Sequence, residues 1–123
     1  MKLKSGQLSK LVLGNLDVKR DFGFAPKYVE AMYLMIQYNL PEDFIICSGK
    51  SISLRSIVEH IFLKLNLPLT HIEISEDLFR PAEILDNFGD PHKAKSLLGW
   101  EYNLDFLEVL DKIIEEEIVA LQR

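Results

Sequence analysis

The chain has 123 residues and a mass of 14.2 kDa, the usual size of a single domain. Its composition, 48% apolar and 27% charged, is typical of globular proteins and excludes wholesale disorder or a fibrous repeat. The net charge of −5 argues against a protein that coats nucleic acid or binds an anionic membrane surface. Basic side chains outnumber acidic ones only in residues 1–27, so we expect any anion site early in the chain.

The first predicted elements are a strand and a helix. Leu11–Leu13 is a short apolar run that ends at Gly14 and Asn15, as a buried strand does. In the helix that follows, Pro26 suits the first turn and Pro41 closes the segment. Its apolar positions recur at helical spacing, and they are Val29, Met32, Tyr33 and Ile36. We expect Met32, Met35, Tyr33 and Tyr38 to form the core and rim of this helix.

The middle of the chain continues the alternation. Phe44–Cys47, which ends at Ser48 and Gly49, predicts a second strand in which Cys47 is a small buried hydrophobe. A helical stripe from Leu54 to Leu65 follows, with Ser51 or Ser53 as its N-cap. A third strand is predicted over 71–75. Alternating strands and helices predict a small α/β layer.

Two helices are predicted in the last third. The first lies between Asp90-Pro91 and Gly99, a cap with proline at one end and a left-handed stop at the other. We expect Trp100 to pin this short helix to the body. The final helix starts at Asp105, whose partner Glu108 resembles a capping box, and carries a solvated acidic face.

Neither a membrane segment nor a disulfide is predicted. The longest apolar run has six residues, against about 18–20 for a bilayer span, and no signal peptide is recognisable. A single cysteine cannot form an intrachain disulfide. The expected location is therefore the cytoplasm.

The spacing of the functional residue types excludes most recognisable catalysts. The closest two glycines are eight positions apart, which fits neither a dinucleotide fingerprint nor a phosphate loop. No tyrosine is followed four positions later by lysine, and the three histidines and one cysteine lack metal-ligand spacing. We therefore predict no catalytic residues, no metal site and no cofactor bound by this chain alone.

A polar loop after the first strand is the strongest candidate for a binding site. Gly14 allows close backbone approach to a flat ligand, and Arg20 can grip a phosphate with two hydrogen bonds. The alternative is that Lys19 and Arg20 pair with Asp17 and Asp21 on the surface.

A second candidate lies around a proline late in the chain. Arg80 and Glu83 are three positions apart, so one side chain can reach a phosphate while the other accepts hydrogen bonds from sugar hydroxyls. The alternative is that Pro81 starts a helix in which Glu83 occupies the first turn.

Taken in order, these segments resemble the C-terminal portion of the GDP-mannose 4,6-dehydratase family, which belongs to the extended short-chain dehydrogenases. The resemblance runs from about Leu11 to the end of the chain. The matching segments are Leu13–Asp17, Lys19–Gly23, Tyr28–Met32, Pro41–Phe44, Ser48–Lys50, Arg80–Glu83, Gly89–Pro91 with Lys93-Ala94, and Leu98–Trp100.

The resemblance implies a small mixed α/β substrate-binding domain over residues 1–123, without the Rossmann half. In such enzymes the Rossmann half binds NADP and carries the catalytic groups, and the C-terminal half holds the nucleotide-sugar. Here Gly14 and Asn15 would lie beside the nucleoside, Arg20 and Arg80 would bind the diphosphate, and Glu83 would bind the ribose. The implied partners are a GDP-sugar and a Rossmann-domain protein or a second copy, with no nucleic acid and no membrane.

Other interpretations stay open. The dehydratases usually show Trp, His and Asp where this chain has Phe22, Phe24 and Lys27, and the connection from His71 to Phe79 is shorter than theirs. Cys47-Ser48-Gly49 and the Arg20-Asp21-Phe22 variant are equally typical of the C-terminal domain of a GDP-4-keto-6-deoxy-mannose reductase, and the short connection favours such a reductase or a general epimerase/dehydratase relative. A different class altogether is a noncatalytic interaction module of the same fold, which pairs through an exposed apolar face.

Overall fold

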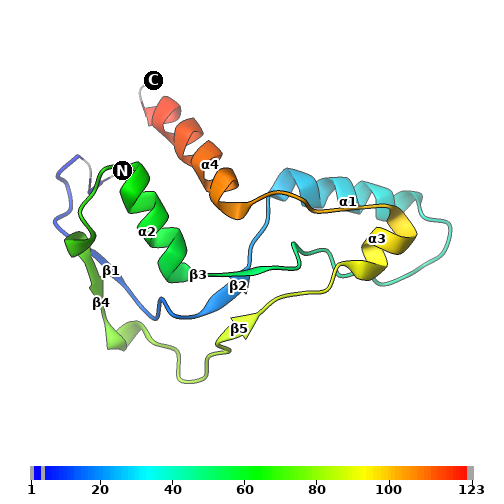
Figure 1. Ribbon diagram of the computed structural model, residues 1–123, viewed down its shortest axis with the longest axis horizontal. Coiled ribbons are helices and arrows are strands. Elements are labelled where there is room, and N and C mark those ends of the chain that lie inside the picture. Colours follow the sequence, from blue (N-terminus) through cyan, green and yellow to red (C-terminus); the bar gives the residue numbers. More distant parts are fainter. Residues whose placement is uncertain (1, 4, 122–123) are drawn as a thin grey trace.

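The computed structural model describes residues 2–3 and 5–121 of the chain, in which helices are interspersed with short strands (Figure 1). The helices are α1 (Ala25–Gln37), α2 (Leu54–Lys64), α3 (His92–Leu98) and α4 (Phe106–Leu121). The strands are β1 (Leu11–Leu13), β2 (Lys19–Asp21), β3 (Ser51–Ser53), β4 (Ile72–Ile74) and β5 (Asp86–Asn87). Two single 3₁₀ turns are η1 (Leu69–His71) and η2 (Glu76–Leu78).

The strands pair in two small sheets. β1 and β4 are parallel, with Leu11 opposite Ile72. β2 lies between β3, to which it is antiparallel, and β5, to which it is parallel. The prediction of a small mixed α/β fold is confirmed, although β2 lies in a stretch that we expected to be a loop.

Most helix ends follow their local sequence. Ser53, one of the two predicted N-caps of α2, accepts a hydrogen bond from the Ser56 amide at 3.0 Å. Gly99 ends α3 with φ of 66°, a left-handed conformation that favours glycine. Asp105 Oδ1 accepts from the Leu107 amide at 3.0 Å and so caps the start of α4.

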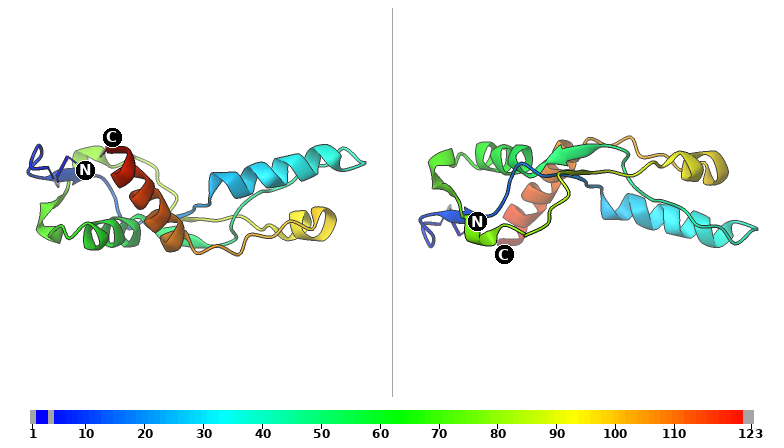
Figure 2. Two further views of the ribbon diagram at one scale, coloured as in Figure 1. Left: turned by 90° about the horizontal axis from the view of Figure 1, so that it is seen from above. Right: turned by 90° about the horizontal axis from the view of Figure 1, so that it is seen from below.

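The molecule is elongated, with α1 and α3 at one end and α2 and α4 at the other (Figure 2). At the first end, Trp100 is 1% exposed and packs with Ala31 of α1 and Ala94 of α3. Its Nε1 donates a hydrogen bond to the Lys27 carbonyl at 3.0 Å, so one side chain joins both helices. The predicted anchoring role of Trp100 is confirmed. No helix among the described residues is long and apolar enough to cross a bilayer.

Two predictions are wrong at this same end. Phe44–Cys47 is extended but is not a strand, because no other described segment pairs with its backbone. The apolar stripe of α1 is also not core: Met32 is 56% and Tyr33 65% exposed, since Ala31 faces the core instead. Cys47 is buried, as predicted.

Candidate functional site

Three residues from separate segments meet beyond the carboxyl end of β1. Asn15 Nδ2 donates to Glu83 Oε2 at 3.3 Å, and Arg20 Nη2 lies 3.9 Å from Glu83 Oε1. The Arg20 and Glu83 side chains are 28% and 17% exposed. The structure therefore brings Asn15, Arg20 and Glu83 together, although the last is 63 positions or more from the others in sequence.

The guanidinium of Arg20 is held by backbone as well as by Glu83. Its Nη1 donates to the Lys19 carbonyl and to the Ile84 carbonyl, both at 2.7 Å. The second bond ties β2 to the loop that carries Glu83. Because Nη1 is occupied, Nε and Nη2 are the donors that a bound anion can reach.

The aspartates that flank Arg20 do not neutralise it. Asp17 pairs with Arg55 of α2 at 2.9 Å. Asp21 accepts hydrogen bonds from backbone amides, as described below. The interpretation of Lys19 and Arg20 as surface partners of these two aspartates is therefore wrong, because both carboxylates have partners from other parts of the chain.

Asp21 fixes the backbone around the candidate site. Its carboxylate accepts from the amides of Ser48 and Gly49 at 2.9 Å each and from the amide of Gly89 at 3.4 Å. These bonds join β2 to two loops that are far apart in sequence. Sequence reasoning did not assign this role, because an aspartate beside an arginine gives no local indication of distant amide partners.

Replacing Asp21 with asparagine should lower the free energy of unfolding by about 1–3 kcal/mol, because an amide group cannot serve all of these donors and some are left unpaired. Urea unfolding followed by circular dichroism measures the change. Asp17→Asn is the matched control: its carboxylate is 72% exposed and pairs with another exposed side chain, so we expect a loss of about 0–1 kcal/mol. Equal stability of the Asp21→Asn protein and the unsubstituted chain would contradict this role.

Two ionisable groups near Asp21 are held in their protonated forms. Burial, with a smaller contribution from the Asp21 charge, raises the pKa of Tyr28 to about 12. Burial and then Asp21 likewise raise the pKa of the Cys47 thiol above its usual value. At neutral pH neither group is therefore a general base or a thiolate nucleophile.

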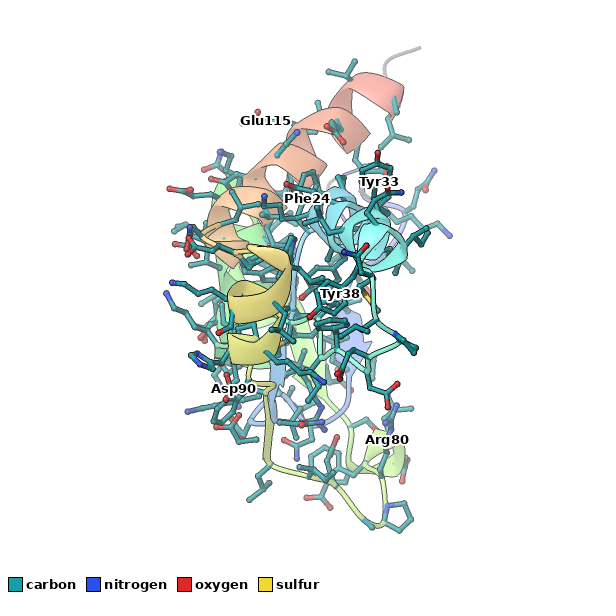
Figure 3. The ribbon with its side chains drawn as sticks, turned by 90° about the vertical axis from the view of Figure 1, so that its right-hand side faces the viewer. Phe24, Tyr33, Tyr38, Arg80, Asp90 and Glu115 are labelled. Carbon is teal, nitrogen blue, oxygen red and sulfur yellow. The ribbon has the colours of Figure 1, made fainter. Side chains whose placement is uncertain are left out.

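The other two predicted site residues are placed differently. What approaches Gly14 closely is this chain's own backbone: a Cβ at this position would lie 2.9 Å from the Leu78 carbonyl oxygen. Arg80 lies on the exposed loop after η2, at the opposite end of the view from Glu115 (Figure 3). Residues 79–84 contain no helix, so the alternative in which Pro81 starts one is wrong.

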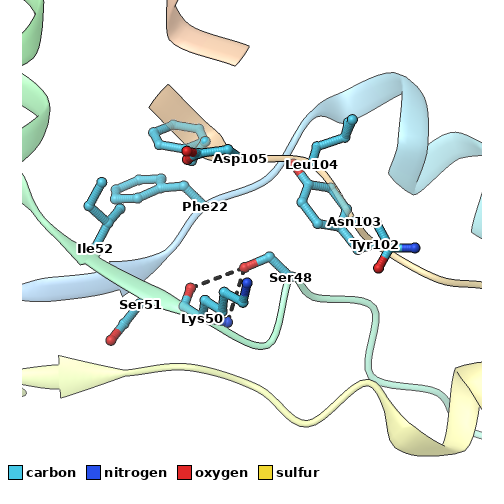
Figure 4. Close-up of a pocket in the computed structure, with 10 residues that line it drawn as sticks. Phe22, Ser48, Lys50, Ser51, Ile52, Tyr102, Asn103, Leu104 and Asp105 are labelled. Carbon is cyan, nitrogen blue, oxygen red and sulfur yellow. Dashed lines mark hydrogen bonds between the residues drawn. The ribbon is translucent and has the colours of Figure 1, made fainter. Parts of the chain in front are cut away.

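A separate cavity lies beside β3. It has a volume of about 520 Å³ and its lining includes Lys50 and the rings of Phe22 and Phe106, which stack at 5.2 Å (Figure 4). None of the five predicted site residues lines it. Within the part of the chain that the structure describes, no group of three or more His, Cys, Asp or Glu side chains is arranged to hold a metal ion.

The family model and the related sequences point to the same family. The family model for GDP-mannose 4,6 dehydratase matches residues 1–113. GDP-mannose 4,6 dehydratase 1 of Arabidopsis thaliana is 35% identical over 99% of this chain, and the human GDP-mannose 4,6 dehydratase is 35% identical over 98%. These matches cover 34% and 37% of the two relatives, so the chain spans about a third of their length.

Solved structures support the fold. UDP-glucose 4-epimerase of Thermotoga maritima, solved with UDP-glucose, superposes with a TM-score of 0.83 at 19% identity over 98% of this chain and 38% of its own. RMD from Pseudomonas aeruginosa, solved with NADPH, gives a TM-score of 0.74 at 22% identity over 86% of this chain and 35% of its own. The fold is thus that of a part of the epimerase and dehydratase enzymes. Together with the family match over most of its length, this shows that the chain belongs to the GDP-mannose 4,6-dehydratase family.

Proposed function

We propose that this chain is a nucleotide-sugar-binding domain that takes a GDP-sugar and is not catalytic alone. The observation that carries the proposal is the convergence of Asn15 and Arg20 with Glu83, which lies in a distant segment. A cation, an amide and a carboxylate are the groups that recognise a diphosphate and sugar hydroxyls.

Each residue has a role that its chemistry supports. Arg20 would bind the diphosphate through Nε and Nη2, and its contact with Glu83, long at 3.9 Å, would yield to the anion. Glu83 would then accept from ribose hydroxyls, with Gly14 and Asn15 beside the nucleoside. Arg80 lies on the exposed loop after η2. It would supply the second cation to the phosphates when that loop closes over them.

The dinucleotide chemistry of the family would come from residues other than those described. A dinucleotide site places a glycine-rich turn directly between a strand and a helix. Here Gly14 follows β1, but the next element is β2 and α1 starts only at Ala25, so the described residues do not fit a dinucleotide pyrophosphate. NADP would therefore be held by a Rossmann domain outside these 123 residues, and we expect the isolated chain not to turn over GDP-mannose.

There is a second candidate for the activity of the enzyme to which this domain contributes. The connection from His71 to Phe79 contains only β4 and the 3₁₀ turn η2, with no long insertion. This short connection favours a GDP-4-keto-6-deoxy-mannose reductase as the enzyme to which such a domain contributes. Both candidates use GDP-sugars, so the binding prediction is the same for each.

Isothermal titration calorimetry of the purified chain tests the proposal. GDP and GDP-mannose should bind, whereas ADP and UDP-glucose, which match them respectively in diphosphate charge but carry other bases, should bind more weakly. Equal binding of all four would indicate general attraction of phosphate to the basic N-terminal third. Absence of binding by GDP and GDP-mannose would contradict the proposed function.

A further inference from the structure

The proposed nucleotide-sugar site contains a carboxylate of its own. Glu83 Oε2 accepts from Asn15 Nδ2 at 3.3 Å, and Glu83 Oε1 lies 3.9 Å from Arg20 Nη2. The Glu83 side chain is 17% exposed, so it lies within the site and not in the surrounding solvent. Its two oxygens face the donors of Asn15 and Arg20, which the proposed function assigns to the ligand. A diphosphate that reaches Arg20 therefore meets a negative charge that is already there.

Arg20 is held more firmly than Glu83. Its Nη1 donates to the Lys19 and Ile84 carbonyls at 2.7 Å each, a short distance that is typical of strong hydrogen bonds from a charged donor. The two contacts of Glu83, at 3.3 and 3.9 Å, are longer than usual for a hydrogen bond between nitrogen and oxygen. Of these two charged side chains, Glu83 is therefore the one that moves when an anion enters.

The backbone on the two sides of Glu83 is held differently. On its C-terminal side the chain is tied to β2, because the Ile84 carbonyl accepts from Arg20 and the Leu85 carbonyl accepts from the Lys19 amide at 2.7 Å. On its N-terminal side, residues 80–83 make no backbone hydrogen bond within the part of the chain that the structure describes. Glu83 thus follows a segment that can rearrange without breaking a backbone bond.

We propose that Glu83 is an internal competitor of the diphosphate, because its carboxylate must leave Arg20 and Asn15 before an anion can bind them. Two negative groups repel each other in a site that is largely covered, so this displacement lowers the affinity for any anion. Sugar hydroxyls give the displaced carboxylate new donors and offset the loss, whereas an anion without them does not. The site therefore selects against phosphates that lack a sugar diol. The inference rests on the proposed function, since it describes the regulation of the same site.

Glu83→Gln tests this inference, because it removes the charge and keeps the shape of the side chain. The probe is 2′,3′-dideoxy-GDP, which has the base and the diphosphate of GDP and no ribose hydroxyls. Isothermal titration calorimetry should show that the full-length variant binds this probe about fivefold or more tightly than the unsubstituted chain does. A residue that only contacts the ligand would give a loss of affinity instead. Glu76→Gln in η2 is the matched control: Glu76 is exposed, the change in net charge is the same, and the affinity should change by about twofold or less.

A second comparison uses the unsubstituted chain and needs no variant. GDP should bind about tenfold or more tightly than 2′,3′-dideoxy-GDP, and in Glu83→Gln this ratio should fall to about threefold or less. Three results would overturn the inference: equal binding of the two nucleotides by the unsubstituted chain, no gain for the dideoxy nucleotide in Glu83→Gln, or the same gain in Glu76→Gln. If GDP does not bind the unsubstituted chain, the proposed function fails. If GDP binds and the dideoxy comparisons fail, only the role of Glu83 as internal competitor is wrong.

Discussion

Arg20→Ala should weaken binding of GDP-mannose by about 1.5–3 kcal/mol, the scale of a charge-assisted hydrogen bond lost from one partner. The side chain is two-thirds or more covered and is oriented by the Lys19 and Ile84 carbonyls, so its free donors are already directed. Removing it also leaves the Glu83 carboxylate without its cation beside the expected diphosphate. Calorimetric titration of the variant with GDP-mannose measures the loss.

Two controls accompany this variant. Lys19→Ala removes a neighbouring cation that is exposed, and it should cost only about 0–0.5 kcal/mol of binding. Arg80→Ala tests the loop cation and should show a loss similar to that of Arg20→Ala if the loop closes on the ligand. Equal binding by the Arg20→Ala and Arg80→Ala variants and the unsubstituted chain would mean that the site is misplaced.

Trp100→Ala should have the largest effect on stability, lowering the free energy of unfolding by about 3–5 kcal/mol. The ring is 1% exposed, lies 6.1 Å from the Tyr28 ring, and donates to the Lys27 carbonyl in the first turn of α1, beside the hydrogen bond from the Phe24 amide to Tyr102 Oη. Its loss opens a cavity between Ala31 and Ala94 and leaves the Lys27 carbonyl without this donor. Because the chain has one tryptophan, far-UV circular dichroism in urea is the suitable measurement.

Trp100→Phe separates the contribution of ring packing from that of the indole hydrogen bond. It keeps a ring in the cluster and loses the indole N–H, so its cost should lie well below that of the alanine variant. If Trp100→Ala unfolded within about 1 kcal/mol of the unsubstituted chain, the α1–α3 end would not depend on this residue for its packing.

Local sequence was sufficient for the helices. The period of apolar residues, the Ser53 cap and the left-handed Gly99 act within a few positions, so the predicted segments and their ends agree with α1 to α4. The three-residue strands were harder to predict. β2 and β5 have polar sequences and exist only because each finds a partner elsewhere, which no local pattern encodes.

The wrong prediction of a strand at Phe44–Cys47 has the same cause. Its sequence has the composition of a buried strand, but strand formation requires a neighbour, and the described chain supplies none. The stripe on α1 was assigned to the core for a related reason. Amphipathic spacing shows that one side of a helix avoids water, and it does not show which molecule covers that side.

By itself, the sequence determined the helical segments, the absence of recognisable catalytic spacing and a family resemblance that the comparisons confirm. Only the tertiary structure decided which polar residues meet: Arg20 joins Asn15 and Glu83 rather than its neighbouring aspartates, and Asp21 binds the amides of two distant loops. The physical reason is the separation in sequence between the groups that interact. Helical turns and caps are satisfied within four residues, whereas strand pairing, burial and the convergence of charges depend on contacts between segments that the chain brings together only when it folds.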